Sequence, residues 1–229
     1  MKKRILLYLI TNRLAFLRSP DIQYDDLPRL QLEVIGKAVR AGCQLIQIRE
    51  KDMSAKELAA FTRAAIECAR PHGARVLVND RLDVAMATGA DGVHLRASSI
   101  PAREVRAVAA KTGLDDFLIG VSTHSVVEAK SAEEGGADFI VCGPVYDTPS
   151  KRTFGPPLGL DVFAEILNSV KTPVLAIGGI NLSNYREPCG AVRRASRLSV
   201  FSPTWRIWNR PSDPLRHTRQ PDQKLIFDT

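Results

Sequence analysis

The feature that most limits the fold of this chain is a repeated alternation of short apolar runs with segments of helical periodicity. The apolar runs are too short for helices and almost continuously hydrophobic, which is typical of strands buried on both faces of a parallel sheet. We expect strands at residues 5–10, 44–49, 75–78, 92–95, 117–120, 139–142 and 174–177. We expect helices between them, at 27–41, 54–72, 82–88, 101–111, 124–134 and 160–170.

This alternation predicts the α/β class. A run of seven strand–helix units favours a TIM (β/α)₈-type barrel over a doubly wound sheet. No GxGxxG motif follows the first strand, which argues against a dinucleotide-binding fold. A length of 229 residues is sufficient for one such barrel.

The sequence changes character after Asn184, where the eighth unit of a barrel is due. Arg, Ser and Pro become frequent and both tryptophans lie in this part, so we expect the eighth βα unit to be missing or replaced by an irregular basic tail. Residues 198–201 offer a makeshift eighth strand. We divide the chain into a barrel domain, 1–185, and an atypical tail, 186–229. One hypothesis is a frameshift in the coding sequence, and a genuine basic tail is the alternative.

The charge distribution argues against nucleic acid as a partner of the barrel domain. The net charge is +7, but the tail carries +5 of it and residues 1–185 carry only +2. No apolar run approaches the length of about 20 residues that a membrane span needs. The apolar run after the basic start is too short for a signal peptide, so we expect a cytoplasmic protein. The four cysteines form no CxxC pair.

Polar residues gather where the expected strands end, and the active site of a βα barrel lies at that end. Alternation along the second strand places Gln47, Arg49 and Lys51 on one side. Cations there suit a diphosphate, and Asp80, after the third strand, suits a hard cation such as Mg²⁺. Two alternatives remain open. Arg49 and Lys51 could pair with acidic neighbours on the surface, and Asn79-Asp80 could cap the next helix.

A long loop follows the sixth strand. It is rich in Gly, Pro, Thr and Ser, and it carries hydroxyls beside cations at Thr148, Ser150, Lys151 and Arg152. Such a combination supplies both charge and directional donors to a phosphate group. The alternative is an ordinary solvated loop.

Together these stretches make the chain resemble the thiamine phosphate synthase family and its close relative, the thiazole tautomerases. The resemblance covers about residues 5–184. Each of the stretches that carry it ends a different strand, in the same order along the chain. They are YLITN at 8–12, QIREK at 47–51, VNDR at 78–81, GADGVHL at 89–95, GVSTHS at 120–125, GPVYDTPSK at 143–151 and IGGI at 177–180.

The resemblance implies a transferase of thiamine biosynthesis that joins hydroxymethylpyrimidine diphosphate to a thiazole phosphate and releases pyrophosphate. It implies phosphorylated small molecules as partners and Mg²⁺ as cofactor, bound by Asp80; it leaves a homo-oligomer open. The residues implied to act in the reaction are Arg49, Lys51, Ser122 and Lys151. The residues implied to bind substrate are Gln47, Ile48, Arg49, Glu50, Lys51, Asn79, Ser122, Thr148, Pro149, Ser150, Lys151, Gly178 and Gly179.

The chain departs from the family pattern in two places. Synthases of the family usually continue His-Leu with Gly-Gln-x-Asp, whose Asp is a second Mg²⁺ ligand, whereas this chain has Arg96-Ala97-Ser98-Ser99. A neutral hydroxyl at Ser99 is a weaker Mg²⁺ ligand than a carboxylate. The eighth βα unit, which in the family contributes amides to the thiazole phosphate, is the second departure. A thiazole tautomerase using His124 as a proton shuttle, and a non-catalytic binding remnant, are therefore alternatives.

Overall fold

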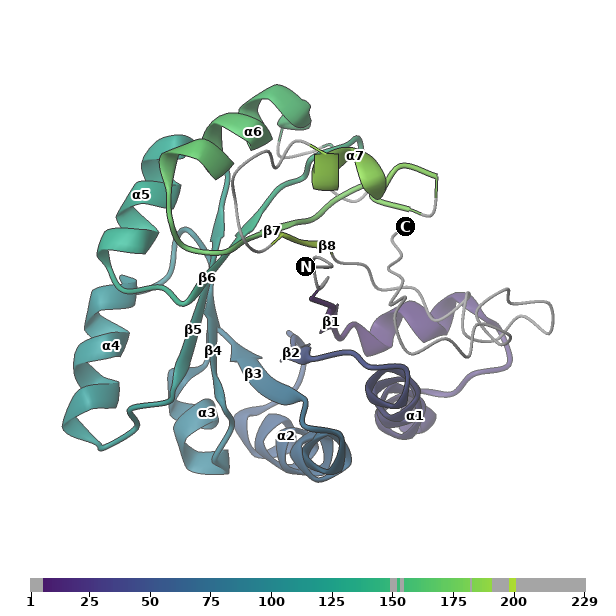
Figure 1. Cartoon of the computed structure of the whole chain (residues 1–229). Helices are drawn as coiled ribbons and strands as arrows, with labels where there is room; N and C mark the ends of the chain where they lie inside the picture. Colours follow the sequence, from purple (N-terminus) through teal and green to yellow (C-terminus); the bar gives the residue numbers. More distant parts are fainter. Residues whose placement is uncertain (1–5, 149–151, 153–154, 182, 191–197, 201–229) are drawn as a thin grey trace.

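Eight parallel strands form one sheet in the order of the chain, β1 to β8. The computed structural model describes residues 6–148, 152, 155–181, 183–190 and 198–200. Figure 1 shows the sheet curled, with helices around its outside, as in a TIM-type barrel. The strands are β1 (Tyr8–Ile10), β2 (Leu45–Ile48), β3 (Arg75–Asn79), β4 (Gly92–Leu95), β5 (Leu118–Thr123), β6 (Phe139–Cys142), β7 (Val174–Ala176) and β8 (Leu198–Val200).

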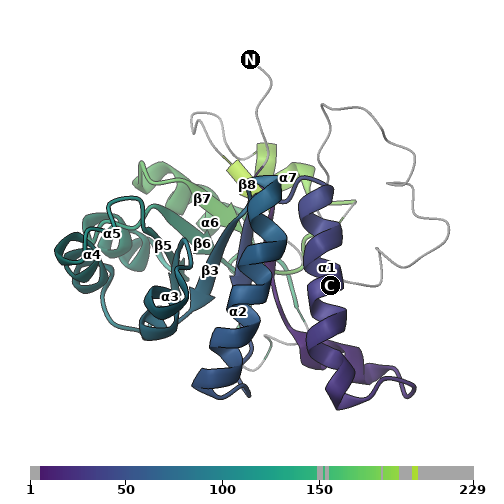
Figure 2. The same ribbon diagram turned by 90° about the horizontal axis from the view of Figure 1, so that it is seen from below.

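The helices lie between consecutive strands and cover the outer face of the sheet (Figure 1). Figure 2 shows α1 and α2 side by side, and the two helices contact each other. The α-helices are α1 (Leu27–Arg40), α2 (Ala55–Ala69), α3 (Leu82–Thr88), α4 (Ala102–Lys111), α5 (Val126–Glu134), α6 (Gly159–Ser169) and α7 (Arg186–Gly190). Short 3₁₀ helices lie at Arg13–Arg18, Tyr24–Asp26 and Arg70–His72.

The apolar side chains form two separate cores, as the alternation along each strand requires. The larger core lies between the strands and the helices, and it includes Ile46, Val78 and Ile140. The smaller core fills the inside of the curled sheet. Its buried members come from neighbouring positions on five strands: Tyr8, Leu45, Leu77, Phe139, Val141 and Leu175.

The strand register brings the inner core and the polar strand ends into layers. Tyr8 pairs with Leu45, and two residues further along Ile10 pairs with Gln47. Gln47 in turn pairs with Leu77. Tyr8, Leu45 and Leu77 belong to the inner core. Because side chains alternate along a strand, Gln47, two residues after Leu45, lies on the same inner face of the sheet. Asn79, Arg49 and Ser122 follow inner-core positions by two or four residues in the same way.

The predicted fold class is confirmed, and several element bounds differ from the prediction. Strand β5 continues to Thr123 rather than stopping at Gly120, so Ser122 lies within a strand. Pro101 is the residue before α4 rather than its first residue. Two short elements lie in the part of the chain predicted to be irregular. Helix α7 precedes β8, and β8 pairs with β7 through Val174↔Leu198 and Ala176↔Val200.

The makeshift strand suggested at residues 198–201 is therefore formed over Leu198–Val200 and covers the edge of β7. Phe201 and the rest of the expected tail lie outside the described residues. Among the helices of the described part, none is long and apolar enough to cross a membrane.

Candidate active site

A cavity of about 260 Å³ lies at the carboxyl ends of β2, β3 and β4. Residues from the loop after β2 form one wall, and residues that follow β3 and β4 form the other. The lining residues are Ile48, Arg49, Glu50, Lys51, Met53, Leu58, Asn79, Asp80, Arg81 and Arg96. Five residues expected to bind substrate (Ile48, Arg49, Glu50, Lys51 and Asn79) and the expected metal ligand thus meet at one site.

Arg49 and Lys51 present positive charge to this cavity without a bound carboxylate. Within the described part of the chain, neither side chain forms an ion pair. Burial lowers the pKa of Arg49 below its ordinary value; nearby Glu50 opposes this shift and the Arg96 cation adds to it. A half-buried guanidinium without an anionic partner is costly to fold, because charges taken from water need compensation. An anionic ligand would supply that compensation.

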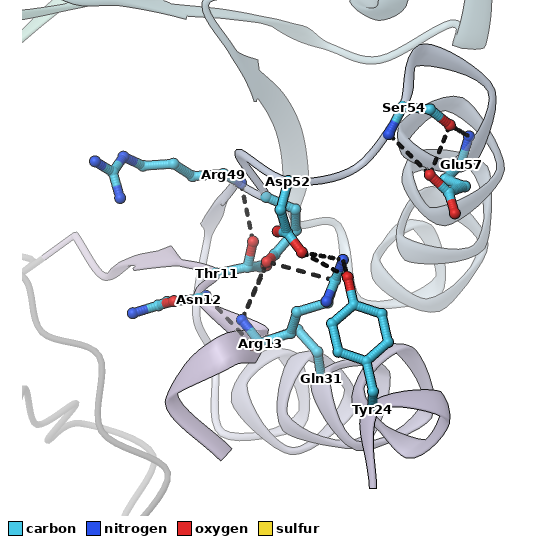
Figure 3. Close-up of polar contacts among 10 residues, drawn as sticks. Thr11, Asn12, Arg13, Tyr24, Gln31, Arg49, Asp52, Ser54 and Glu57 are labelled. Carbon is cyan, nitrogen blue, oxygen red and sulfur yellow. Dashed lines mark hydrogen bonds and ion pairs between the residues drawn. The ribbon is translucent and has the colours of Figure 1, made fainter. Parts of the chain in front are cut away.

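The surface pairing considered for Arg49 and Lys51 does not occur, because the acidic neighbours bind Arg13 instead. The amide of Arg13 donates to both carboxylate oxygens of Glu50, at 3.3 and 3.1 Å. Its guanidinium donates to Asp52 at 2.8 Å and to the Tyr24 hydroxyl at 3.1 Å. Figure 3 shows this cluster, with the Arg49 side chain extending away from it. The cluster fixes the loop that carries Arg49 and Lys51.

Sequence reasoning assigned no role to Arg13, which is 3% exposed. One arginine after a strand gives no signal of burial. The start of α2 was predicted correctly. Ser54 accepts from the amide of Glu57 at 3.3 Å, and Glu57 accepts from the amide of Ser54 at 2.8 Å. This capping box begins the helix directly after the loop.

Asp80 has an unusual backbone and a fully engaged carboxylate. Its φ of 62° is in the left-handed region, which costs free energy for a residue with a side chain. Its amide donates to the carbonyl of His94 at 2.8 Å, which holds the β3 end against β4. One carboxylate oxygen accepts from Arg96 and the other from the Ser99 hydroxyl. The helix-cap alternative is wrong, because Arg81 precedes α3 and no side chain caps that helix.

A chain of three polar side chains crosses the inside of the barrel below the cavity. The Tyr8 hydroxyl lies 3.1 Å from Nδ1 of His94, and Nε2 of His94 lies 2.8 Å from the Ser122 hydroxyl. Burial, reinforced by nearby Arg49 and opposed by Asp80, lowers the pKa of His94 to about 3. The ring is therefore neutral at neutral pH, and its hydrogen bonds set the orientation of Ser122. Gln47 lies in the same interior, and its buried amide nitrogen has no hydrogen-bond partner among the described residues.

A second group of residues expected to bind substrate follows β6 and β7. Gly178 and Gly179 have φ values of 93° and 66°, and they lie against the loop after β6. A Cβ on Gly178 would meet Pro144 at 2.4 Å and the Thr148 hydroxyl at 3.3 Å. Glycine is needed here because the two loops approach too closely for any side chain. Pro149, Ser150 and Lys151 lie outside the described residues.

Other kinds of chemistry find little support in the described residues. No group of three His, Cys, Asp or Glu side chains there could hold a metal ion. Burial, with a smaller effect from Glu128, raises the pKa of the Cys142 thiol to about 12, so it is not a thiolate nucleophile. His124, the suggested proton shuttle, is exposed and its Nδ1 lies 3.3 Å from Glu128.

The comparisons with known proteins agree with this geometry. The family model described as "Thiamine monophosphate synthase" matches residues 16–200. The thiamine-phosphate synthase of Roseiflexus sp. is 40% identical over 172 residues, which cover 75% of this chain and 70% of that protein. The enzyme of the same name from Methanospirillum hungatei is 41% identical over 171 residues, covering 75% and 80%.

Among solved structures, thiamine phosphate pyrophosphorylase from Pyrococcus furiosus is 31% identical, with a TM-score of 0.69. The similarity covers 87% of this chain and 86% of that one. The family match extends beyond Asn184, where the sequence resemblance ended, and it includes β8. This chain therefore belongs to the thiamine monophosphate synthase family.

Proposed function

We propose that this protein is a thiamine-phosphate synthase that couples hydroxymethylpyrimidine diphosphate to a thiazole phosphate and releases pyrophosphate. Family membership supports a transferase of thiamine biosynthesis with phosphorylated small-molecule substrates. The observation that carries the substrate assignment is the pair of cations, Arg49 and Lys51, that line the cavity without carboxylate partners. The cavity lies at the strand ends, where barrel enzymes bind their substrates.

The proposed reaction breaks one bond and forms another. The bond between the pyrimidine methylene carbon and the diphosphate oxygen breaks, and its electron pair leaves with the pyrophosphate. The lone pair of the thiazole nitrogen then forms a bond to the methylene carbon. No protein nucleophile is needed, which fits a cavity that no cysteine of the described residues lines. The contribution required of the protein is positioning and stabilisation of the negative charge that develops on the leaving group.

In this proposal Arg49, Lys51 and Lys151 neutralise the departing pyrophosphate. Gln47, Asn79 and Ser122 orient the pyrimidine. The unpartnered amide nitrogen of Gln47 supports that role, because a buried donor without an acceptor costs free energy that a ligand acceptor would recover. Ser122 is oriented through His94 and Tyr8.

The thiazole phosphate is assigned to the half-site between β6 and β7. The residues assigned to it are Thr148, Pro149, Ser150, Gly178 and Gly179, of which Pro149 and Ser150 lie outside the described residues. The close approach of Gly178 to Thr148 supports the assignment, since amides and hydroxyls that converge in a glycine-rich turn form an anion-binding concavity.

The Mg²⁺ implied by the resemblance does not fit the arrangement at Asp80. Both oxygens of this carboxylate are engaged, one by a guanidinium and the other by a hydroxyl. The position of the second carboxylate is Ser99, and the described residues contain no acidic cluster. Mg²⁺ prefers carboxylate and phosphate oxygens with ordered waters, and a bound cation beside Asp80 opposes its entry.

The cytoplasmic location and a homo-oligomer remain predictions.

The test is a coupling assay on the purified chain, an Arg49→Met variant and an Arg103→Met control. Arg103 is an exposed arginine on α4, paired with Glu104. We expect the Arg49 variant to lose about 10²–10³-fold in kcat/KM and the Arg103 variant to match the parent. Isomerisation of the thiazole without coupling would support a tautomerase instead. Substrate binding without any turnover would support a binding remnant.

A further inference from the structure

We propose that Arg96 binds the diphosphate of the pyrimidine substrate directly, in the position that the family resemblance gives to Mg²⁺. Binding of the diphosphate by this chain would then need no divalent cation. The inference rests on the proposed function in one respect, namely that the ligand is a diphosphate. It departs from the family pattern through two residues of this chain, Arg96 and Ser99.

Arg96 lies at the rim of the cavity, directly after β4. It shares the cavity lining with Arg49 and Lys51, and its charge is close enough to Arg49 to lower the pKa of that residue. Four cations line this cavity of about 260 Å³, and one of them, Arg81, is paired with Asp83. Of the other three, Arg96 is paired with Asp80 and Arg49 and Lys51 have no ion pair within the described residues. A diphosphate carries enough negative charge to compensate this excess, and a neutral ligand would not.

The Arg96 side chain is held in place by Asp80. Its Nε donates to Oδ2 of Asp80 at 2.7 Å, and its Nη2 forms an ion pair with the same oxygen. A guanidinium has five N–H donors, so this contact leaves donors on the other nitrogen for a ligand. Planar guanidinium groups bind phosphate through paired hydrogen bonds. Asp80 thus orients Arg96 while the remaining donors are available to the diphosphate.

Ser99 completes this arrangement by fixing the turn after β4. The amide of Arg96 donates to the Ser99 hydroxyl oxygen at 2.9 Å, and the amide of Ser99 donates to the carbonyl of Arg96 at 3.0 Å. The Ser99 hydroxyl donates to Oδ1 of Asp80. A carboxylate at position 99 could not donate this hydrogen bond, and it would face the like charge of Asp80. The serine therefore suits an arginine partner for Asp80 better than it suits a metal.

The residues at positions 96 and 99 together add the charge of a divalent cation. Replacement of the family's aspartate by Ser99 removes one negative charge, and replacement of its glycine by Arg96 adds one positive charge. The net change is +2, which equals the charge of the Mg²⁺ that the site would otherwise bind. A guanidinium supplies this charge without the geometric demand of six-fold oxygen coordination.

The experiment measures binding of inorganic pyrophosphate by calorimetry, once in EDTA and once in excess Mg²⁺. We expect the parent dissociation constant in the two buffers to agree within about threefold. Arg96→Gly should weaken binding in EDTA at least tenfold. The double variant Arg96→Gly, Ser99→Asp should bind at least tenfold more tightly in Mg²⁺ than in EDTA, because it recreates the carboxylate pair.

Two further variants guard against an effect of folding alone. Arg29→Ala removes an exposed arginine on α1 that is paired with Asp26 and Glu33, and it should bind pyrophosphate like the parent. Arg96→Lys keeps the charge without the planar fork, so it should show weakened binding that still persists in EDTA. Cooperative thermal unfolding of each variant, followed by circular dichroism, shows that it is folded.

Loss of parent binding in EDTA, or unchanged binding by Arg96→Gly, would overturn the inference. These outcomes are distinct from a failure of the proposed function. A parent that couples its substrates only in Mg²⁺ would refute the role of Arg96 and leave the synthase assignment intact. A parent that binds pyrophosphate in EDTA but forms no thiamine phosphate would refute the synthase assignment and leave the cation-independent anion site.

Discussion

The backbone amide of Arg49 donates a 2.9 Å hydrogen bond to the side-chain oxygen of Thr11. Thr11 is fully buried after β1, and Arg49 follows β2. This bond, drawn in Figure 3, ties the ends of the two strands together directly beside Arg49, whose side chain lines the cavity. The position of a cation proposed to bind substrate is thus set by a buried hydroxyl that does not itself line the cavity.

Thr11→Val should reduce coupling while leaving the protein folded. The substitution keeps the shape of the side chain and removes the acceptor, so a buried amide loses its partner at a cost of about 1–3 kcal/mol. We expect a rise in KM for the diphosphate substrate of about tenfold. Thr62→Val is a matched control, because Thr62 is buried and its hydroxyl has no hydrogen-bond partner. Equal kinetics in the two variants would show that Thr11 does not position Arg49.

Gly179→Ala should weaken the thiazole phosphate half-site. Gly179 and Gly113 have nearly the same φ, 66° and 69°, so alanine meets similar backbone strain of about 1 kcal/mol at each. Only at Gly179 would the new Cβ also clash, with Tyr146 Cβ at 2.6 Å. We expect a roughly tenfold rise in KM for the thiazole phosphate in Gly179→Ala and no change in Gly113→Ala. An equal rise in the steady-state KM for the thiazole phosphate in both variants would refute a special role for the turn.

His94 should make the protein less stable in mild acid. Its folded pKa is about 3 because of burial, below its ordinary value of 6.5. Above pH 6.5 the ring is neutral in the folded and in the unfolded chain, so its titration does not change the free energy of unfolding. As the pH falls, His94 binds a proton in the unfolded chain but not in the folded chain. The contribution of this group therefore falls by about 1.4 kcal/mol per pH unit between 6.5 and 3.

The comparison is with His94→Gln, which cannot titrate. Its free energy of unfolding in urea should be lower than that of the parent at pH 7.5. The difference should shrink by about 2–3 kcal/mol on going to pH 4.5. Parallel stability curves for the two proteins across this range would show that His94 is not buried as a neutral ring.

Lys151→Ala should abolish coupling without loss of folding. Lys151 lies outside the described residues, so this prediction rests on the family resemblance and on the chemistry of the loop. Removal of a charge-assisted contact to the leaving pyrophosphate should cost about 2.7–4 kcal/mol, as for the loss of an oxyanion donor. The measurement is kcat in the coupling assay. An unchanged kcat would remove Lys151 from the mechanism.

The fold was predictable because buried strands leave a simple signal. Seven strands were found from short apolar runs, and the fold class followed from their alternation with helices. The signal failed where strand residues are polar. Val121–Thr123 extend β5 although Ser and Thr resemble the start of a loop. Strand β8 was suggested only as a makeshift strand at residues 198–201, because it is three residues long and lies in a stretch rich in Arg, Ser and Pro; the structure forms it beside β7.

The site was predictable in outline and unpredictable in its partners. Alternation along β2 placed Gln47 and Arg49 on one side; the register pairs Gln47 with Ile10 and Leu77, and Arg49 lines the cavity just beyond the strand. The contacts between strands were not visible, because they join residues far apart in sequence. Arg13 pairs with the acidic neighbours of Arg49, and Arg96 pairs with the carboxylate of Asp80. Charge pairing of this kind depends on strand order and register, which local sequence does not encode.

The most direct test of the central claim is the stoichiometry of the reaction. The purified chain is incubated with hydroxymethylpyrimidine diphosphate and the thiazole phosphate, and thiamine phosphate and pyrophosphate are measured over time in Mg²⁺. The account predicts that both products form together in equal amounts, and that neither forms when one substrate is omitted. Failure of a folded, cooperatively melting chain to form thiamine phosphate, or pyrophosphate release that does not depend on the thiazole, would contradict it.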